Sequence, residues 1–544
     1  AKSGPQHLNF RLKGRGELVR LYGSRRNPID EVEIINQSDG VSRGCLPDGA
    51  KNYVDFVDTP TPGASNYLPL TEVVFNEILS HTDAPYEDAI ELRNISTSEI
   101  DLSGWLLSDE SGADKQFKIP NGTTISPGGY TVFYEGDFNP VGSGFSLNSA
   151  HGDTVYLSAI GDDGTPNGYR VVQSIPPAAN GVSFGLVSTS QGMKNTALTR
   201  PTFGNDSPES IASFRTGKGA ENTLPLIGPV VINEIQYQGS SSILGLDQSQ
   251  LEYIELYNIS NVTVPLYNPL EPLNTWRLSG GVSMRFPSNI NLPDNGYLLL
   301  VGFDPVKSPS IESRFRDYYN VPEEVKIIGP LKGRLSNDGE TISLLRADNS
   351  QGIDQQDAGY VPYVPVESIT YDNADPWPSD ADGIGFSIQR VSTSKFGDEP
   401  KNWYSDSPTA GRNNIGIMVN DRDADGMVDE WEVEFGLNPA NASDAMVDTD
   451  SDGVINLDEF LAGTDPNNPN DRFIIESIKI SDDKVTVTAY VSPSKSYSVE
   501  VSDTVNGRWI HLVDFTAKDD QSTIKFETNF EFGSTQFYRI LLTE

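Results

Sequence analysis

The sequence predicts an all-β protein of several domains, and three observations support this fold class. The chain has 544 residues. One hydrophobic core does not organise so long a chain, so we expect about three to five domains. Its 49 glycines and 36 prolines accompany little helical periodicity, which favours short strands joined by turns. Hydrophobic residues make up 36% of the chain, which is enough to form packed cores.

Three segments of the chain end alike, which predicts copies of one domain. The shared endings read GVSRGCLPDG from Gly40, GVSFGLVS from Gly181 and GIGFSIQRVS from Gly383. A pattern typical of a β-hairpin precedes each ending. The clearest example is GRLSNDGETISLLRA from Gly333, in which alternating residues follow a turn.

Two of these segments also open alike. VVFNEILSHTDAPYEDAIELRNIS begins at Val73, and VVINEIQYQGS begins at Val230 with LEYIELYNIS after it. Each opening is followed by a strand that contains a tryptophan, Trp105 or Trp276, and then by two strands joined at a turn.

The V-N-E-I…IEL-x-N…W-x-L…P-x-G-Y pattern resembles the lamin tail domain, an immunoglobulin-like β-sandwich. The resemblance covers residues 70–207 and 228–414, and the last part of a copy at 1–66. It implies tandem immunoglobulin-like sandwiches and no shared catalytic residues. The copy at 70–207 departs slightly, because it reads V-F-N-E-I. Exported bacterial proteins use this domain in tandem, so the resemblance implies an extracellular or cell-surface location.

The first segment, residues 1–66, has only the end of this pattern. A sandwich without its opening strands would leave sheet edges open and a core uncovered. We therefore expect the chain to be the C-terminal part of a longer protein. The alternative is that residues 1–66 pack as extra strands onto the sandwich at 70–207.

Residues 415–470 carry 14 acidic side chains against one basic side chain. Two runs, DRDADGMVDEWE and DTDSDGVINLDE, match the spacing of the 12-residue EF-hand calcium loop. The sequence therefore predicts two Ca²⁺ sites. The predicted ligands are Asp421, Asp423, Asp425, Met427, Asp429 and Glu432 in the first loop, and Asp448, Asp450, Asp452, Val454, Asn456 and Glu459 in the second.

This spacing suits calcium because Ca²⁺ takes six to eight hard oxygen ligands at about 2.3–2.6 Å. Met427 and Val454 would bind through their backbone carbonyls. Gly426 and Gly453 can take the positive φ that turns the chain around the ion. Without metal the carboxylates repel each other, so the folding of residues 415–470 should depend on calcium. A solvated acidic linker is the alternative, but such a linker would scatter its charges.

One short helical pattern follows each loop. MVDEWEVEF ends at Gly436 and INLDEFLA ends at Gly463, each with a proline beyond. No helix is expected before either loop. The segment is therefore similar to dockerin or thrombospondin type 3 calcium repeats, and a structural role fits it better than a sensor role.

Residues 471–544 alternate between apolar and polar side chains, which predicts a small C-terminal β-sandwich. This domain would either sort or attach the protein, or only cap the chain. Its expected core consists of Tyr497, Val499, Val501, Trp509, Ile524, Phe526, Phe537 and Ile540.

The G-x-S-x-G pattern of a nucleophile elbow occurs around Ser42 and Ser183. Both lie in an all-β pattern without the strand-to-helix turn that displays such a serine. The third copy, read from Gly383, has no serine at that place. We therefore predict no catalytic residues and no enzymatic activity.

A group of acidic and amide residues recurs in both complete copies. A polar ligand site is one interpretation, but edge charges and turn-forming asparagines fit the pattern better. The group consists of Glu77, Glu91 and Asn94 in one copy and Glu234, Glu255 and Asn258 in the other.

The formal net charge of −38 disfavours nucleic acid and anionic lipid as partners, because both need clusters of Lys and Arg. No apolar run is long enough for a membrane span. A single cysteine, Cys45, excludes an internal disulfide and a cysteine-based zinc site. The sequence leaves the oligomeric state open.

The leading hypothesis is a calcium-binding, non-enzymatic scaffold or adhesion protein outside the cell. Its expected partners are protein or polysaccharide ligands, which the loops of the sandwiches would contact. The alternative is the non-catalytic C-terminal portion of a larger exported enzyme, a hydrolase or a spore-coat-kinase-like protein, whose active domain lies upstream.

Overall fold

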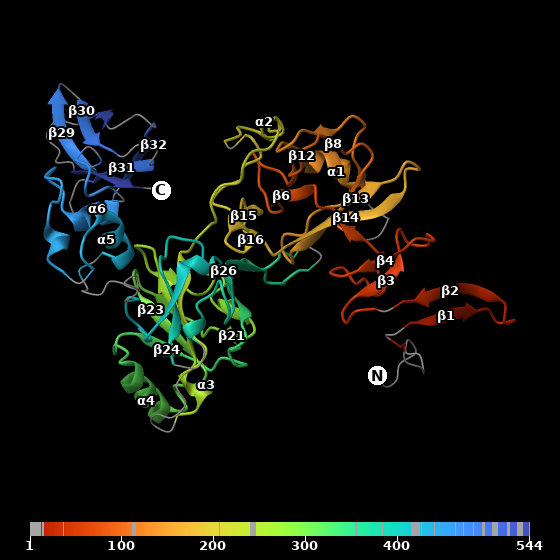
Figure 1. The fold of residues 1–544 in the computed structure, drawn as a ribbon, viewed down its shortest axis with the longest axis horizontal. Helices are drawn as coiled ribbons and strands as arrows, with labels where there is room; N and C mark the ends of the chain where they lie inside the picture. The colour runs from red at the N-terminus through yellow and green to blue at the C-terminus, as the bar shows by residue number, and fades with distance from the viewer. Residues whose placement is uncertain are drawn as a thin grey trace. The chain divides into compact units, whose positions relative to one another are not determined.

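The protein is described by a computed structural model, in which the chain divides into two compact units, Ala1–Arg412 and Asn413–Glu544. The prediction of an all-β protein is confirmed, since strands β1–β34 dominate the described residues (Figure 1). No described helix is both long enough and apolar enough to cross a bilayer. The structure describes residues 12–13, 16–35, 37–110, 116–205, 207–239, 246–353, 357–381, 385–414, 425, 427–439, 441–462, 464–469, 471, 473–481, 484–491, 496–502, 510–518, 523–529 and 537–542.

The first segment forms two separate antiparallel pairs, each a sheet of its own. The pairs are β1 (Glu17–Tyr22) with β2 (Pro28–Ile34) and β3 (Ser42–Cys45) with β4 (Tyr53–Phe56). No described strand of residues 1–66 joins a sheet of the next sandwich, but Leu46, just after β3, is buried and lies close to Gly168 of that sandwich. The extra-strand alternative therefore stays open. Leu21 and Ile29 are exposed on the first pair.

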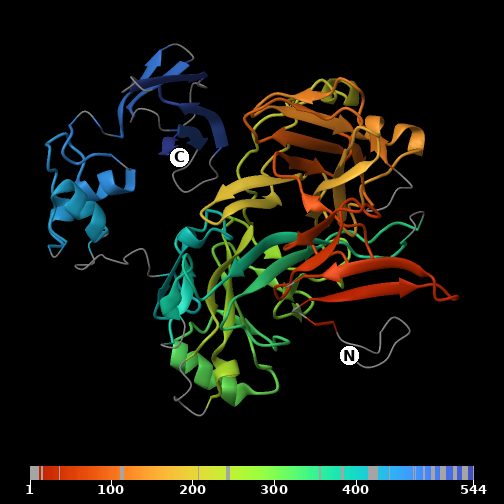
Figure 2. The same ribbon diagram turned by 45° about the vertical axis from the view of Figure 1, so that its right-hand side comes forward.

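Residues 68–197 form a sandwich of two five-stranded sheets, with strand orders β12-β7-β6-β15-β16 and β10-β9-β13-β14-β5. Alternate apolar side chains of both sheets fill the core between them, for example Leu92 and Leu157. Its strands, orange to yellow, can be followed in Figure 2. They are β5 (Leu68–Pro69), β6 (Val73–Leu79), β7 (Ala89–Asn94), β9 (Leu106–Ser108), β10 (Phe117–Lys118), β12 (Tyr130–Tyr134), β13 (Asp153–Ile160), β14 (Pro166–Ile175), β15 (Phe184–Thr189) and β16 (Gly192–Ala197), with β8 (Ile100–Asp101) and β11 (Thr124–Ile125) as a small third sheet.

Residues 230–406 form a second sandwich, with strand orders β24-β23-β18-β17-β27-β28 and β21-β20-β25-β26. The two sheets share one core, which includes Ile232 and Ile342. Its strands are β17 (Val230–Gln236), β18 (Tyr253–Asn258), β20 (Arg277–Gly280), β21 (Met284–Arg285), β23 (Tyr297–Val301), β24 (Lys326–Ile328), β25 (Glu340–Ala347), β26 (Tyr363–Tyr371), β27 (Ser387–Arg390) and β28 (Trp403–Asp406), with β19 (Val264–Pro265) and β22 (Asn291–Leu292) as a small third sheet.

The two sandwiches repeat one arrangement. The order β12-β7-β6-β15-β16 of the first corresponds to β23-β18-β17-β27-β28 of the second, as the shared sequence patterns predict. Both opening strands carry a register shift just before their glutamate, Glu77 in β6 and Glu234 in β17. Such a β-bulge changes which face of the sheet the following side chains meet.

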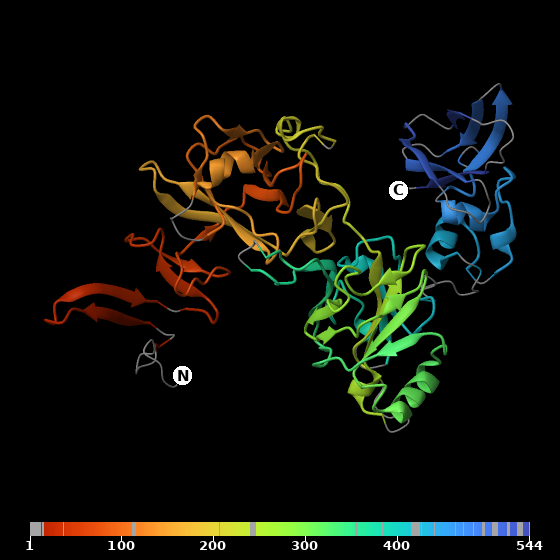
Figure 3. The ribbon, with the colours of Figure 1, turned by 180° about the vertical axis from the view of Figure 1, so that it is seen from behind.

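Short helices complete the first unit. The longest, α4 (Pro309–Tyr319), lies at one end of the second sandwich in Figures 1 and 3, and its Phe315 and Tyr319 build a smaller core with Leu251 and Leu299. The other helices are α1 (Glu135–Phe138), α2 (Ile211–Phe214) and α3 (Gln248–Leu251), with 3₁₀ turns η1 (Pro140–Gly142), η2 (Ser379–Ala381) and η3 (Pro400–Asn402).

The second unit begins with helices α5 (Asp429–Phe435) and α6 (Asn456–Ala462), at the positions the sequence predicts. Gly436 caps α5 with a left-handed φ of 78°, as expected, whereas Gly463 lies outside the described residues. The expectation that nothing helical precedes either loop is wrong for the second, because the 3₁₀ turn η4 (Asp444–Met446) comes before it.

Two three-stranded sheets, β29-β30-β33 and β32-β31-β34, follow the helices. Of the predicted core, Tyr497, Val499, Ile524 and Ile540 are buried and Phe526 packs against them, whereas Val501 and Phe537 are half-buried and Trp509 lies outside the described residues. The strands are β29 (Ile474–Ser481), β30 (Lys484–Tyr490), β31 (Ser496–Ser502), β32 (Ile510–Thr516), β33 (Thr523–Asn529) and β34 (Phe537–Leu542).

Candidate metal centre

The first acidic loop brings three carboxylates together. One oxygen each from Asp425, Glu432 and Asp444 lies within 4.8 Å of the others. The loop supplies Asp425, helix α5 supplies Glu432, and η4 supplies Asp444. Of the other predicted ligands, Asp421 and Asp423 lie outside the described residues, and so does the side chain of Asp429.

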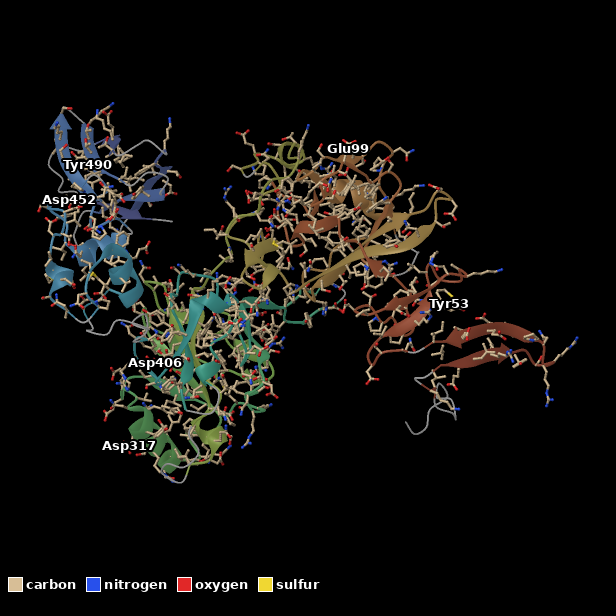
Figure 4. All side chains as sticks on the ribbon, in the orientation of Figure 1. Tyr53, Glu99, Asp317, Asp406, Asp452 and Tyr490 are labelled. Carbon is tan, nitrogen blue, oxygen red and sulfur yellow. The ribbon has the colours of Figure 1, made fainter. Side chains whose placement is uncertain are left out.

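The second loop gathers Asp448, Asp450 and Asp452, whose oxygen atoms also lie within 4.8 Å of one another. Its backbone wraps around these side chains, since the amide of Asp452 donates to Asp448 Oδ1 at 3.1 Å and that of Gly453 to Asp448 Oδ2 at 2.9 Å. Gly453 has a φ of 97°, as the predicted turn requires. Figure 4 labels Asp452 in this segment.

Both loops share one turn at positions 5 to 7. The amide of Met427 donates to Asp425 Oδ1 at 2.9 Å, and the amide of Val454 donates to Asp452 Oδ1 at 2.9 Å. The side chains of Met427 and Val454 are buried and carry no oxygen, so only their backbone carbonyls could bind a metal. The roles of positions 5 and 7 as calcium ligands stay predictions.

The glutamate that closes each loop is fully buried, with Glu432 and Glu459 both 0% exposed. Burial, and then the nearby charges of Asp450 and Asp452, raise the pKa of Glu459 to about 7. Thr464 Oγ1 donates to Glu459 Oε1 at 3.3 Å, and Glu459 Oε2 has no hydrogen-bond partner among the described residues. Buried carboxylates crowded in this way are unfavourable unless a cation neutralises them.

Asn456 links the second loop to the 3₁₀ turn η4. Its Nδ2 donates to the backbone oxygen of Asp444 at 2.9 Å, and its side chain is 0% exposed. No described residue donates to its Oδ1, although position 9 is where the calcium template places an oxygen ligand. Every side chain gathered at the two loops offers oxygen, which suits a hard cation such as Ca²⁺ better than a transition metal.

Helices α5 and α6 can be followed in Figure 1. Aromatic side chains pack between them. Trp431 meets Phe460 at 5.2 Å and Phe435 at 4.9 Å between ring centroids. Asn467 Nδ2 donates to the backbone oxygen of Phe435 at 2.9 Å. These contacts hold the closing glutamates of both loops on one small helical pair.

Sequence reasoning missed Asp444, because it lies outside both 12-residue templates. It also misjudged the recurring glutamates of the sandwiches. Glu77, Glu91, Glu234 and Glu255 are 0% exposed on central strands, so the interpretation as edge charges is wrong.

The recurring asparagines do form turns, as predicted. Asn94 Oδ1 accepts from the amide of Ser96 at 2.9 Å, and Asn258 Oδ1 accepts from the amide of Ser260 at 3.0 Å. Both asparagine side chains are buried at the end of a central strand.

Each sandwich buries one glutamate under the chain segment that follows its last strands. Glu77 accepts hydrogen bonds from the backbone amide and the hydroxyl of Thr202 and from Ser183, and Glu234 accepts the same set from Thr409 and Ser387. Ser183 therefore donates into a buried carboxylate. The third copy does have this serine, Ser387, which the comparison of the sequence endings had missed.

The second glutamate of each sandwich accepts from the same segment, Glu91 from the amide of Ala220 at 3.2 Å and Glu255 from the amide of Gly411 at 2.6 Å. In each sandwich the two glutamates are cross-strand partners. Residues 69–169 match the family model of the Lamin Tail Domain. The lamin-tail match contains Glu77 and Glu91, and the sandwich at 230–406 is similar to it by strand order and by its own glutamate pair.

No curated protein matches the chain. Among solved structures, the chain is similar to a DUF4876 family protein from Bacteroides thetaiotaomicron VPI-5482, with 11% sequence identity over 58% of this chain and 90% of that chain. The TM-score of 0.20 is too low to relate the two folds in detail.

We expect the stability of the sandwich at 68–197 to depend on pH through Glu91. Burial, and then the charge of Glu77, raise the pKa of Glu91 to about 9. The pKa of Glu91 is higher in the folded state than in the unfolded state. Its contribution to the free energy of unfolding is therefore fully present below about pH 4.5 and is lost as the pH rises towards 9. The free energy of unfolding should fall by at most about 1.4 kcal/mol per pH unit.

Glu91→Gln should flatten this slope, because glutamine is neutral at every pH in the window. Calorimetry between pH 5 and 9 would follow the unfolding transition of this sandwich. Glu99→Gln, at an exposed position of the same sandwich (labelled in Figure 4), is the control and should keep the wild-type slope. An unchanged slope in Glu91→Gln would show that Glu91 does not cause the pH dependence.

Proposed function

We propose that the chain is a non-enzymatic, modular extracellular scaffold or adhesion protein that binds two calcium ions in residues 421–471. The observation that carries this proposal is the convergence of carboxylates at both loops. Asp425 and Glu432 of the first loop meet Asp444 of η4, and the second loop gathers Asp448, Asp450 and Asp452. In the second loop the backbone amides of Asp452, Gly453 and Val454 donate to Asp448 and Asp452, and a tight turn of this kind supports the proposal.

Calcium fits better than magnesium. Ca²⁺ accepts a flexible shell of six to eight oxygens, whereas Mg²⁺ demands a smaller octahedral shell and keeps several waters. Two loops rich in carboxylates, each closed by a buried glutamate, offer the larger shell.

Bound calcium would neutralise the crowded carboxylates and order the segment between the sandwiches and the terminal β domain. Calcium sites of extracellular modules commonly bind with a Kd of about 10⁻⁴–10⁻³ M, which suits a structural ion outside the cell. Loops of the sandwiches would then contact protein or polysaccharide partners.

Isothermal titration of the metal-free chain with calcium chloride tests the proposal. We expect about two ions per chain, and much weaker binding of magnesium. Glu434→Gln, on the exposed side of α5, should bind calcium as the wild type does. A wild-type chain that takes up no calcium at millimolar concentration would refute the proposal.

A further inference from the structure

Asp444 lies outside the loop template, yet its carboxylate meets the first site. An oxygen of Asp444 lies within 4.8 Å of oxygens of Asp425 and Glu432. The residue is only 9% exposed, and no described residue donates to its Oδ1. A buried carboxylate oxygen without a donor beside two further carboxylates indicates a place for a cation.

A hydrogen bond within a short turn holds this carboxylate. Asp444 Oδ2 accepts from the backbone amide of Asn438 at 3.0 Å, just after helix α5 ends. The backbone oxygen of Asp444 accepts from Asn456 Nδ2 at 2.9 Å, so the second loop also fixes its position. One oxygen of the carboxylate is thus used for the fold and the other is left for a ligand.

The second site repeats this turn at the same spacing. Asp471 Oδ2 accepts from the backbone amide of Asp465 at 3.2 Å, and no described residue donates to its buried Oδ1. Asp471 follows Glu459 by 12 residues, as Asp444 follows Glu432. The amide donor comes six residues after the glutamate in both cases.

The repeat therefore extends beyond the loop and helix. In each copy an acidic loop leads into a helix, and a buried glutamate closes the loop. An aspartate beyond the helix then accepts a hydrogen bond from a backbone amide six residues before it. Glu459 follows Glu432 by 27 residues, and Asp471 follows Asp444 by the same interval. Such regularity in both hydrogen bonding and spacing indicates one role for the two aspartates.

We propose that Asp444 and Asp471 each supply a further oxygen ligand to the calcium ion of the preceding loop. The inference rests on the proposed function. Each ion would then join the loop, the helix and the turn after the helix. Adding a carboxylate raises the affinity of a calcium site, because affinity follows ligand charge and rigidity.

Asp444→Asn and Asp471→Asn test this inference by calcium titration of the full chain. Asparagine keeps an oxygen that can accept the hydrogen bond of the turn, but it removes the charge and weakens ligation. We expect each substitution to lower the calcium affinity of one site by about tenfold or more and to leave two sites in total. Asp458→Asn, at an exposed position of α6, is the matched control and should titrate as the wild type does.

A thermal melt with and without EDTA separates ligation from a purely structural role. If the aspartates are ligands, the variants should match the wild type in EDTA and fall below it only in calcium. Equal destabilisation in both conditions would overturn the inference. Wild-type affinity for both ions in Asp444→Asn and Asp471→Asn would also overturn it while the proposed function stands. A wild-type chain that binds no calcium would instead refute the proposed function itself.

Discussion

Replacing Glu432 or Glu459 with glutamine is expected to lower the calcium affinity of its own site by about 100-fold or more. The glutamate at position 12 supplies two oxygens to the ion, whereas glutamine supplies one neutral oxygen. Even residues outside the ligand shell of a metal are worth about 10- to 100-fold in affinity, so a bidentate ligand should be worth more.

Titration calorimetry should show one remaining site of wild-type affinity in each single variant and none in the double variant. Both glutamates are fully buried, so the exposed neighbour Glu434 provides the control for removing a negative charge from the same helical pair. Two sites of wild-type affinity in Glu432→Gln would mean that the first loop does not use its closing glutamate.

The acidic loops could be proposed as calcium sites from the sequence because their predicted ligands are close neighbours along the chain. Alternate aspartates, a glycine and a closing glutamate fall within 12 positions, and the amides of Met427 and Val454 form turns at Asp425 and Asp452. Asp444 could not be found in this way, because only the fold after α5 returns it to the first loop. The regular 27-residue interval between Glu432 and Glu459 was the available signal.

The repeated strands were predictable, but the environment of their glutamates was not. Alternation along a strand assigns faces only while the register holds, and a bulge precedes both Glu77 and Glu234. The groups that satisfy Glu77 come from Thr202 and Ser183, more than 100 positions further along the chain. No local pattern carries that information.

The equivalent of Ser183 was missed for a related reason. Aligning the repeats on their glycines places Gly385 opposite Ser183. In the structure, Phe184 pairs with Ile78 and Ile388 pairs with Ile235. The strand pairing therefore makes Ile388 the equivalent of Phe184. Ser387 then takes the place of Ser183, and its hydrogen bond to the buried glutamate confirms the register.

The second large effect that we expect is calcium-dependent protection of residues 425–471 against proteolysis. Calcium at 100 times the Kd of a site should stabilise the folded segment by about 2.7 kcal/mol, which corresponds to roughly 100-fold slower cleavage through the open state. A protease that cuts after glutamate is the suitable probe, because Glu432 and Glu459 are buried in the folded segment.

The sandwiches provide an internal control, since Glu77 and Glu91 are equally buried but lie far from the loops in sequence. The chain should remain uncut after Glu77 and Glu91, both in calcium and in EDTA. Magnesium at the same concentration should protect residues 425–471 less than calcium does, because the carboxylate-rich loops suit the larger ion.

Digestion of the full chain in calcium and in EDTA, with cut sites assigned by mass spectrometry, tests the central claim most directly. We predict cuts at Glu432 and Glu459 that appear rapidly in EDTA and are suppressed by calcium, while the sandwiches stay intact. Equal cutting at both glutamates with and without calcium would contradict the claim that these acidic loops fold around the ion.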